Sequence, residues 1–252
     1  MKKGRILLAS EPGEIHAVSA NSDGLPVLAD GRIPTEGSYT WLPPVEVGTV
    51  FALGLNYADH AKELAFKAPE VPLVFLKGPN TIAGHRAHTV RPADATYMHY
   101  ECELAVVIGK TGYQVKKADA MDIVGGYSVA NDYAIRDYLE NYYRPNLRVK
   151  NRDGCTPLGP WLVDRDDVAN PMALALTTRV NGKTTQRGTT ADMIFDIPTL
   201  IEYLTSFMTL NPGDVILTGT PEGLADVKAG DVVETEIEAV GCLTNTIVAQ
   251  PA

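Results

Sequence analysis

The chain has 252 residues and a formal net charge of -9, from 31 acidic and 22 basic residues. Its hydrophobic content of 45% and charged content of 21% are ordinary for a soluble globular protein and exclude a disordered chain. The acidic balance argues against nucleic acid or an anionic membrane as a partner. A small anionic substrate would therefore need local positive charge.

The cysteines and the N-terminus indicate the compartment. Cys102, Cys155 and Cys242 are odd in number, far apart and without C-x-x-C spacing, so we expect reduced thiols and a cytoplasmic location. The apolar run 6–9 is too short for the core of a signal peptide, and no stretch approaches the length of a membrane span.

Residues 1–45 alternate short apolar runs with clusters of Gly, Pro, Asp and Glu, and end near Pro43 and Pro44. This pattern predicts a small β-rich N-terminal segment. Residues 46–252 would then form one larger catalytic domain. We find no residue pattern in the N-terminal segment that indicates chemistry.

A strand and a short helix are predicted next. Residues 49–54 read as a strand, and residues 56–64 have helix-forming composition with Asn56 as the expected cap. His60 and Glu63 are three apart, so on a helix the carboxylate can orient the imidazole and raise its basicity. The pair could act as a general base, although most such pairs are surface neighbours. The helix and the proline-rich loop that follows could also form a mobile lid.

Two carboxylates lead into the most apolar stretch of the chain, residues 99–109, which ends at Gly109. The β-branched composition predicts a strand that enters a buried core. Side chains two apart on a strand point to the same face. Glu101 and Glu103 should therefore project together, with Cys102 on the opposite face.

This arrangement favours a cation. Ionised carboxylates are costly to bury unless they are paired or bind a metal, and no basic residue lies close to this pair in the sequence. Donor sets made only of oxygen favour Mg²⁺, Mn²⁺ or Ca²⁺. Asp132 ends a second apolar run, 123–130, and supplies a third oxygen if the two strands are neighbours. The alternative is a solvated strand edge with no ligand role.

Residues 136–152 are unusually basic. They hold five basic side chains, where the chain-wide 22 in 252 predicts about one or two. The five are Arg136, Arg144, Arg148, Lys150 and Arg152. This segment could supply the positive charge that an anionic substrate needs. The alternative for Arg144, Arg148 and Arg152 is a solvated basic loop, and residues 134–143 are predicted to be helical.

The C-terminal part predicts mostly strands, at 159–163, at 174–180 with a hairpin turn at Asn181–Gly182, and two more joined at Val240–Gly241. One amphipathic helix is expected near 197–208. A strand from residue 215 runs into the sequence Thr-Gly-Thr-Pro-Glu-Gly at 218–223, whose hydroxyl and N–H groups could hold a carboxylate. The same sequence is also compatible with a plain turn.

In order along the chain, these motifs resemble the fumarylacetoacetate hydrolase family over the region 47–248. The motifs that carry the resemblance are 54–60, 100–109, Asn131–Asp132, Lys150, 159–161 and 218–223. The resemblance implies an α+β, β-rich catalytic domain with a rolled mixed sheet. It also implies a homodimer or a higher homo-oligomer.

The resemblance assigns roles to the candidate site residues. Glu101, Glu103 and Asp132 match the ligands of a Mg²⁺ or Mn²⁺ site. His60 and Glu63 match the dyad that family hydrolases use to activate water.

A second group of positions matches those that bind the substrate. Lys150 and Thr220 correspond to residues that bind its carboxylate or oxo groups, with Lys150 also adding positive charge at the reacting oxygen. Arg136 is expected to join them.

The implied reaction is the divalent-metal-dependent decarboxylation or isomerisation of an unsaturated 2-oxo dicarboxylate or tricarboxylate in aromatic-compound catabolism, through an enolate. Two alternatives use the same site, namely hydrolysis of an acylpyruvate such as fumarylpyruvate and decarboxylation of oxaloacetate. A third, from another class, is a non-catalytic protein that binds a metal or a small molecule.

Overall fold

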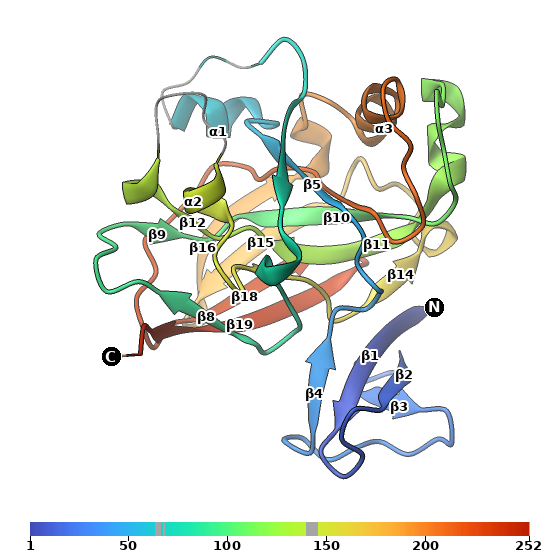
Figure 1. Ribbon diagram of the computed structural model, residues 1–252, viewed down its shortest axis with the longest axis vertical. Helices are drawn as coiled ribbons and strands as arrows, with labels where there is room; N and C mark the ends of the chain where they lie inside the picture. The colour runs from blue at the N-terminus through green and yellow to red at the C-terminus, as the bar shows by residue number, and fades with distance from the viewer. Residues whose placement is uncertain (64–66, 68, 140–145, 252) are drawn as a thin grey trace.

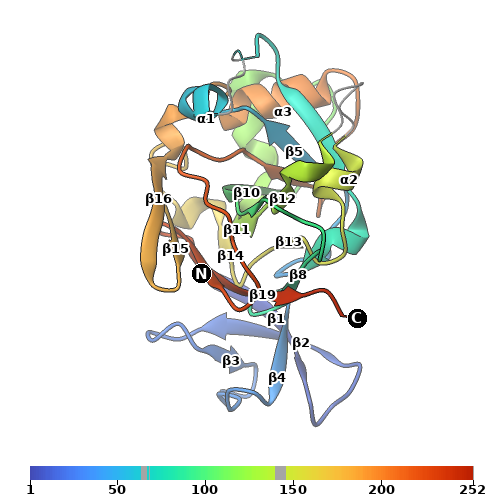
Figure 2. The same cartoon turned by 90° about the vertical axis from the view of Figure 1, so that its left-hand side faces the viewer.

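The computed structural model of the chain describes residues 1–63, 67, 69–139 and 146–251, and the structural statements below concern these residues. Two β-sheets dominate the fold (Figures 1 and 2). No helix among the described residues has both the length and the apolar character needed to cross a membrane. The helices are short, as expected for a β-rich α+β protein.

The larger sheet has ten strands and is mixed. In spatial order its strands are β3 (Pro26–Leu28), β2 (Ile15–Ala20), β1 (Lys2–Leu8), β14 (Leu162–Asp164), β11 (Val124–Asn131), β10 (Cys102–Ile108), β17 (Val215–Leu217), β5 (Val50–Gly54) and β6 (Leu73–Lys77), with β4 (Tyr39–Leu42) paired to β1. Only β17 and β5 run parallel among the described pairs of this sheet.

The second sheet has five strands. They are β16 (Lys183–Thr189), β15 (Ala175–Val180), β18 (Val232–Ile237), β19 (Gly241–Ala249) and β8 (His88–Arg91). Two further pairs of short strands are β12 (Ala134–Ile135) with β9 (Met98–His99) and β13 (Thr156–Pro157) with β7 (Ile82–Ala83). The prediction of a β-rich fold with a mixed sheet is confirmed.

The helices are α1 (Ala58–Glu63), α2 (Leu147–Lys150) and α3 (Ile197–Thr205). Single 3-10 turns are η1 (Pro79–Thr81), η3 (Arg136–Tyr138), η4 (Arg165–Asp167) and η5 (Thr190–Asp192), and η2 (Lys117–Ile123) is longer. Helix α3 is the predicted amphipathic helix. Its apolar residues recur with helical spacing and face the core, and Asp196 caps it by accepting the Thr199 backbone N–H at 2.9 Å.

The main core lies between the two sheets and under α3. Strand β10 is buried along its whole length, with Leu104, Val106 and Ile108 in this core. Ala105 and Val107, on its other face, belong to a second cluster with β5 and β17. Burial of a single large aliphatic side chain contributes about 1.5–3 kcal/mol, so both faces of β10 are firmly held. This rigid strand carries the candidate site at its N-terminal end.

Strands β1 to β4 form a lobe below the main body in Figure 1. The lobe has its own small cluster, in which Trp41 meets Trp161 edge to face with ring centroids 5.0 Å apart. Strand β1 also pairs with β14, which continues the large sheet into the lobe. The β-rich character expected for residues 1–45 is confirmed, while the domain boundary stays a prediction.

Two local predictions were wrong. Residues 134–139 do not form the predicted helix, because Ala134 and Ile135 pair with β9 and only the single 3-10 turn η3 follows. Residues 140–143 lie outside the described residues. Asn56 does not cap α1. Its amide instead ties the loop to the carbonyls of Phe195 and Thr218.

Candidate metal and active site

Three carboxylates meet where β10 begins and β11 ends. The two strands are antiparallel with Cys102 opposite Asn131, and the Asp132 N–H donates to the Glu101 carbonyl at 3.0 Å. Glu101, Glu103 and Asp132 are all buried, and one ligand oxygen of each lies within 4.8 Å of the others. The expectation that these strands are neighbours is confirmed, and the solvated-edge alternative is wrong.

Two buried lysines reach the carboxylates from distant parts of the chain. The Lys150 ammonium, at the end of α2, lies 2.5 Å from Glu101 Oε2 and 2.8 Å from Asp132 Oδ2. The Lys77 ammonium, at the end of β6, lies 2.5 Å from Asp132 Oδ1 and contacts the backbone carbonyl of Lys150. The triad therefore has basic neighbours in space, although it has none nearby in the sequence.

The carboxylates differ in their electrostatic surroundings. Burial raises the pKa of Glu103 well above its usual value, and the charges of Asp132 and Glu101 raise it further. Burial also opposes ionisation of Glu101, but the charges of Lys150 and Arg136 outweigh it and lower the pKa of Glu101. Burial likewise lowers the pKa of Lys150, whereas Asp132 and Glu101 raise it more, so its net pKa is raised. Glu103 is therefore the carboxylate whose charge is least compensated.

This group of residues fits a divalent cation. Glu103 Oε1 is buried and has no hydrogen-bond partner among the described residues, whereas Oε2 accepts the Gly219 N–H at 2.7 Å. A buried carboxylate oxygen without a partner is costly. Lys77, Lys150 and Arg136 pair with Asp132 and Glu101, whereas none of the described basic groups forms a salt bridge with Glu103. An all-oxygen donor set suits Mg²⁺ or Mn²⁺.

His60 and Glu63 form the expected contact on α1. His60 Nδ1 lies 3.1 Å from Glu63 Oε2, and the His60 side chain is buried. Glu63 Oε1 accepts the backbone N–H groups of Gly223 and Leu224 at 3.1 and 3.2 Å. The turn after β17 contacts both groups, since the Gly219 N–H donates to Glu103 and the Gly223 N–H donates to Glu63.

The basic segment divides into two parts. Arg136 is half-buried, donates from Nε to His99 Nε2 at 2.7 Å, and places its terminal nitrogen 3.5 Å from Glu101 Oε1. Arg148 instead stacks over the Tyr138 ring at 4.2 Å, and Arg152 lies 5.8 Å from the same ring centroid. Among the described basic residues of this segment, only Arg136 and Lys150 reach the carboxylates. Arg144 lies outside the described residues.

Thr220 lies in the turn that follows β17. The preceding residue, Gly219, has φ of +88° and holds Glu103 through its N–H, so this turn touches the triad directly. An added Cβ at Gly219 would lie 2.9 Å from Cβ of Asn56. Thr220 is buried, and its Oγ1 accepts a hydrogen bond from Gln186 Nε2 at 3.0 Å. The segment 218–223 therefore forms a turn that also contacts the carboxylate triad through Gly219.

Sequence reasoning missed Lys77, His99 and Gln186. A lysine that ends an apolar strand was the only signal for Lys77. His99 precedes the acidic motif, yet its role appears only through its contact with Arg136. Gln186 gave no signal, because Thr220 and Pro221, which it contacts, lie 34 and 35 residues away.

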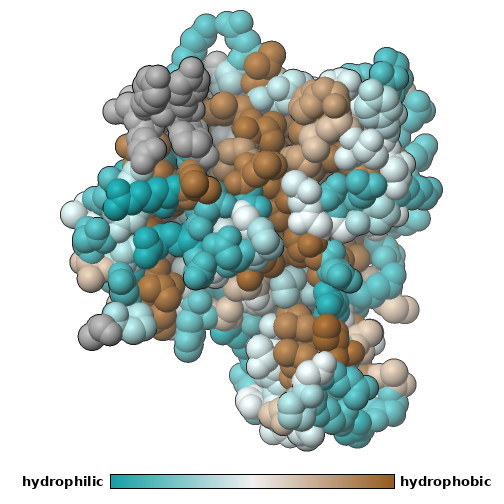
Figure 3. Space-filling model, in the orientation of Figure 1, coloured by the Kyte–Doolittle hydropathy of each residue, from teal (hydrophilic) through white to brown (hydrophobic). Residues whose placement is uncertain are grey.

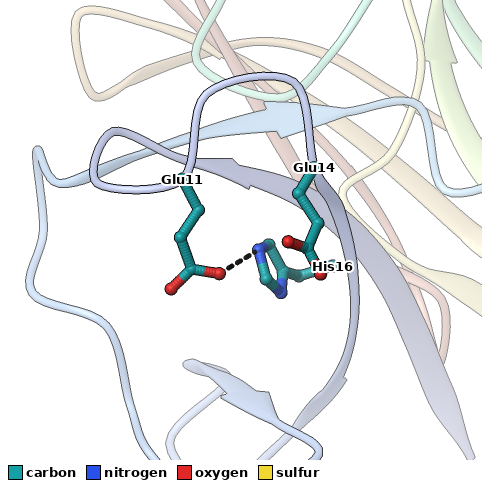
Figure 4. A group of neighbouring side chains, drawn as sticks. All are labelled: Glu11, Glu14 and His16. Atoms are coloured by element: carbon teal, nitrogen blue, oxygen red, sulfur yellow. Dashed lines mark ion pairs between the residues drawn. The ribbon is translucent and has the colours of Figure 1, made fainter.

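A second group of potential ligands lies on the N-terminal lobe (Figure 4). Glu11, Glu14 and His16 bring one donor atom each within 4.8 Å of one another, and His16 Nε2 lies 3.1 Å from Glu11 Oε2. Glu14 is exposed and the other two are half-exposed, so water can solvate these charges. Burial distinguishes the triad from this surface group.

Comparison with known proteins decides the family. The model of the fumarylacetoacetate (FAA) hydrolase C-terminal domain matches residues 49–248. The chain belongs to this family. The matched region begins just before β5 and contains every residue of the candidate site.

Relatives of known name are similar over most of this chain. It is 60% identical over 225 residues to the 4-hydroxyphenylacetate degradation bifunctional isomerase/decarboxylase of Salmonella dublin, covering 89% of this chain and 52% of the relative. The homoprotocatechuate catabolism bifunctional isomerase/decarboxylase of Escherichia coli matches with the same identity and coverage. The chain thus spans about half the length of these curated relatives.

Solved structures share the whole fold. A 5-carboxymethyl-2-hydroxymuconate delta-isomerase from Mycobacterium smegmatis is 38% identical with a TM-score of 0.86, covering 100% of both chains. Fumarylpyruvate hydrolase from Pseudomonas aeruginosa in complex with Mn²⁺ and pyruvate is 31% identical with a TM-score of 0.77, covering 85% of this chain and 94% of that one. The predicted family and fold are confirmed.

Proposed function

We propose that this member of an enzyme family catalyses divalent-metal-dependent decarboxylation or isomerisation of an unsaturated 2-oxo dicarboxylate or tricarboxylate in aromatic-compound catabolism. The observation that carries the proposal is the buried triad of Glu101, Glu103 and Asp132 with basic groups around it. The 60% identity to isomerase/decarboxylases of 4-hydroxyphenylacetate degradation supports the substrate class.

The triad would hold Mg²⁺ or Mn²⁺. When bound, the cation supplies Lewis acidity, which stabilises negative charge on a substrate oxygen by several kcal/mol. The Mn²⁺ in the fumarylpyruvate hydrolase structure supports a divalent cation in this family. Glu103, with its unpartnered oxygen, is the residue whose burial such a cation would compensate most.

Basic and hydroxyl side chains would bind the substrate. Lys150 lies against the triad, so its ammonium would attract the carboxylate or oxo oxygens and the charge that develops during decarboxylation. Arg136 faces the same site from the other end of the basic segment and would bind a second carboxylate. Thr220 would donate its hydroxyl proton to a substrate oxygen.

His60 and Glu63 would move protons. A carboxylate that accepts a hydrogen bond from Nδ1–H leaves Nε2 free to take a proton. Isomerisation needs a proton removed at one carbon and returned at another, which a single buried imidazole can perform. Glu63 also fixes the position of α1 through its two backbone partners.

A second candidate, hydrolysis of an acylpyruvate, is favoured by one observation. The His60–Glu63 contact of 3.1 Å is the arrangement needed to deprotonate a water molecule. The 31% identity to fumarylpyruvate hydrolase is consistent with it. Oxaloacetate decarboxylation would use the same cation and lysine.

The deciding experiment is a mass spectrum of the products formed by Mg²⁺-loaded protein. One tube receives 5-oxopent-3-ene-1,2,5-tricarboxylate and another receives fumarylpyruvate. Loss of CO₂ in the first tube alone supports the decarboxylase, whereas pyruvate and fumarate in the second tube indicate a hydrolase. Oxaloacetate in a third tube tests the remaining decarboxylation.

A matched variant separates an enzyme from a non-catalytic binding protein. We expect Glu103→Gln to lose Mg²⁺ binding and turnover together, because both depend on the same oxygen atoms. A metal-free variant with full turnover would contradict the assignment of the triad. Binding of Mg²⁺ by the wild-type protein with no turnover in any tube would favour the non-catalytic alternative.

We also propose a homodimer or higher homo-oligomer. Strand β6 ends the large sheet and exposes Leu73 and Leu76, with Val71 exposed just before it. Figure 3 shows hydrophobic surface on this face of the main body. An apolar sheet edge left in water invites pairing with another chain. Sedimentation velocity of the wild-type protein tests this proposal.

A further inference from the structure

We propose that Gln186, held by Thr178, is a positioning residue that directs the hydroxyl proton of Thr220 toward the substrate. The inference rests on the proposed function, because it assigns a partner to a residue given a substrate-binding role there. Neither Thr178 nor Gln186 belongs to a motif of the family resemblance. Both lie on the five-stranded sheet.

The three side chains form one buried line of hydrogen bonds. Thr178 on β15 and Gln186 on β16 are directly opposite in the strand register. Thr178 Oγ1 donates to Gln186 Oε1 at 2.9 Å, and Gln186 Nε2 donates to Thr220 Oγ1 at 3.0 Å and to the Pro221 carbonyl at 2.8 Å. All three side chains are at most 2% exposed.

The surroundings determine which way the Gln186 amide points. The Pro221 carbonyl can only accept a hydrogen bond, so the amide nitrogen must face it. The amide oxygen then faces Thr178, whose hydroxyl can donate. With the nitrogen fixed on the side of Pro221, Gln186 is a donor to Thr220 and cannot be its acceptor.

This direction determines what Thr220 can do. A hydroxyl has one proton, and Oγ1 of Thr220 already accepts from Gln186. Within the described part of the chain, no oxygen accepts the Thr220 proton. Thr220 directly follows Gly219, whose N–H holds Glu103, so the free proton belongs to the site of the triad. A substrate carboxylate or oxo oxygen is the acceptor that it fits.

Two glycines allow the close approach that this line requires. A Cβ on Gly188 would lie 2.5 Å from Cγ of Pro221, and a Cβ on Gly223 would lie 3.1 Å from Cα of Gln186. Strand β16 therefore packs directly on the turn at 221–223. Such packing fixes the distance between the Gln186 amide and the Thr220 hydroxyl.

The test is a double-mutant cycle with oxalate, a planar dianion that resembles the enolate of a 2-oxo acid. Oxalate affinity is measured by calorimetry on Mn²⁺-loaded protein for wild type, Gln186→Met, Thr220→Val and the double variant. We expect Gln186→Met to weaken oxalate binding about tenfold, the order of one hydrogen bond, and to have no further effect when Thr220 is already Val.

Two results would overturn the inference. One is unchanged oxalate affinity in Gln186→Met. The other is an equal loss from Gln186→Met in the presence and absence of the Thr220 hydroxyl, which would indicate a structural role only. Affinity for Mn²⁺ alone, a readout of the intact triad, should be unchanged in Gln186→Met.

Two further variants complete the design. Thr178→Val keeps the shape of the side chain but removes the donor to the Gln186 amide oxygen. We expect a smaller loss of oxalate affinity than in Gln186→Met. This variant replaces Gln186→Met in the test if Gln186→Met does not fold. An unchanged oxalate affinity in Thr178→Val would then contradict the positioning role of Gln186. Arg187→Gln, exposed on the same strand, should bind oxalate as wild type does.

The outcomes separate this inference from the proposed reaction. Suppose that oxalate affinity changes across the four proteins as expected, but none of the three substrates is turned over. This result would support the positioning role of Gln186 and reject the proposed reaction. Decarboxylation by the wild type, together with an oxalate affinity that Gln186→Met does not change, would support the reaction and reject the positioning role of Gln186. Failure of the Mn²⁺-loaded wild type to bind oxalate would overturn both.

Discussion

Lys77 and Glu103 show how opposite charges are balanced in the buried site. The Lys77 side chain is fully buried, with Asp132 as its acidic partner, whereas Glu103 has one oxygen without any partner in the described residues. A buried charge is tolerated when an opposite charge lies beside it and is costly when none does. These two residues should therefore respond oppositely to mutation in the absence of metal.

Lys77→Met should destabilise the metal-free protein by about 3–5 kcal/mol, because it leaves Asp132 with less compensation. Saturating Mn²⁺ should restore part of this loss, since the cation supplies positive charge beside the same carboxylate. Urea unfolding with and without Mn²⁺ measures both quantities. The control is Lys117→Met, whose half-exposed ammonium lies 3.0 Å from Asp196 and should contribute less than about 1 kcal/mol. An equal loss with and without Mn²⁺ would mean that Lys77 acts by packing alone.

Glu103→Gln should stabilise the metal-free protein at pH 8 by about 1–3 kcal/mol, because it removes a buried charge and can still accept the Gly219 N–H. Burial and the charges of Asp132 and Glu101 raise the pKa of Glu103 in the folded state. Between the unfolded and folded pKa values the folded chain binds more protons. Stability of the metal-free wild type therefore falls as pH rises through that window.

Urea unfolding at pH 5 and pH 8 tests this prediction. Wild type should lose stability between the two values, and Glu103→Gln should lose less. Saturating Mn²⁺ should stabilise the wild type by a few kcal/mol, and the variant should lack this gain. A variant less stable than wild type at pH 8 without metal would contradict the argument.

Glu63 connects helix α1 to the turn after strand β17. One carboxylate oxygen accepts two backbone N–H groups from residues 223 and 224, and the other contacts His60. The helix has six residues and would be marginal alone, so this connection helps to hold it over the site. The position of α1 therefore depends more on the contacts of Glu63 than on the helix propensity of its six residues.

Glu63→Gln should lower the rate of proton-transfer steps by about 10²–10⁴-fold with a change in stability below about 1 kcal/mol. The amide oxygen can keep the two backbone N–H groups, which turns the NH₂ group toward His60 Nδ1. That nitrogen must then accept, and the proton moves to Nε2, where the base is needed. Turnover measured beside urea unfolding, with the exposed Lys62→Gln as control, checks this. Unimpaired turnover in Glu63→Gln would remove the dyad from the mechanism.

One sheet joins the N-terminal lobe to the rest of the molecule. Strand β14 lies between β1 and β11, and Trp161, just before it, packs on Trp41 of the lobe. Removing the lobe would turn β14 into an edge strand and expose an aromatic ring. An open apolar edge favours association between chains.

A chain of residues 46–252 should therefore unfold at a lower temperature than the full chain and associate at high concentration. Thermal unfolding and size-exclusion chromatography measure these effects. The full-length variant Trp41→Ala, expected to cost about 3–5 kcal/mol, shows how much of the effect comes from the lost packing. Unchanged melting and a single species would instead show that residues 1–45 are an independent appendage.

The acidic motif was predictable because strand periodicity is a local property of the backbone. Alternation along 101–104 placed Glu101 and Glu103 on one face, and the end of the next apolar run placed Asp132 beside them. The hairpin turn at Asn181–Gly182 is also confirmed, with positive φ at both residues. The mixed β-rich fold and the family followed from the order of such motifs.

Partners from distant segments were decided only by the tertiary structure. Lys77 meets Asp132 across 55 residues, although β10, β17 and β5 lie between β6 and β11 in the same sheet. Their contact therefore depends on how the whole sheet folds in three dimensions. Arg148 and Arg152 had the same sequence signal as Arg136, yet the Tyr138 ring draws them away from the carboxylates. Pairing between distant charges depends on strand order and on which faces become buried, and neither is encoded in local periodicity. The sequence thus determined which residues can perform the chemistry, and the packing of the two sheets decided which of them meet.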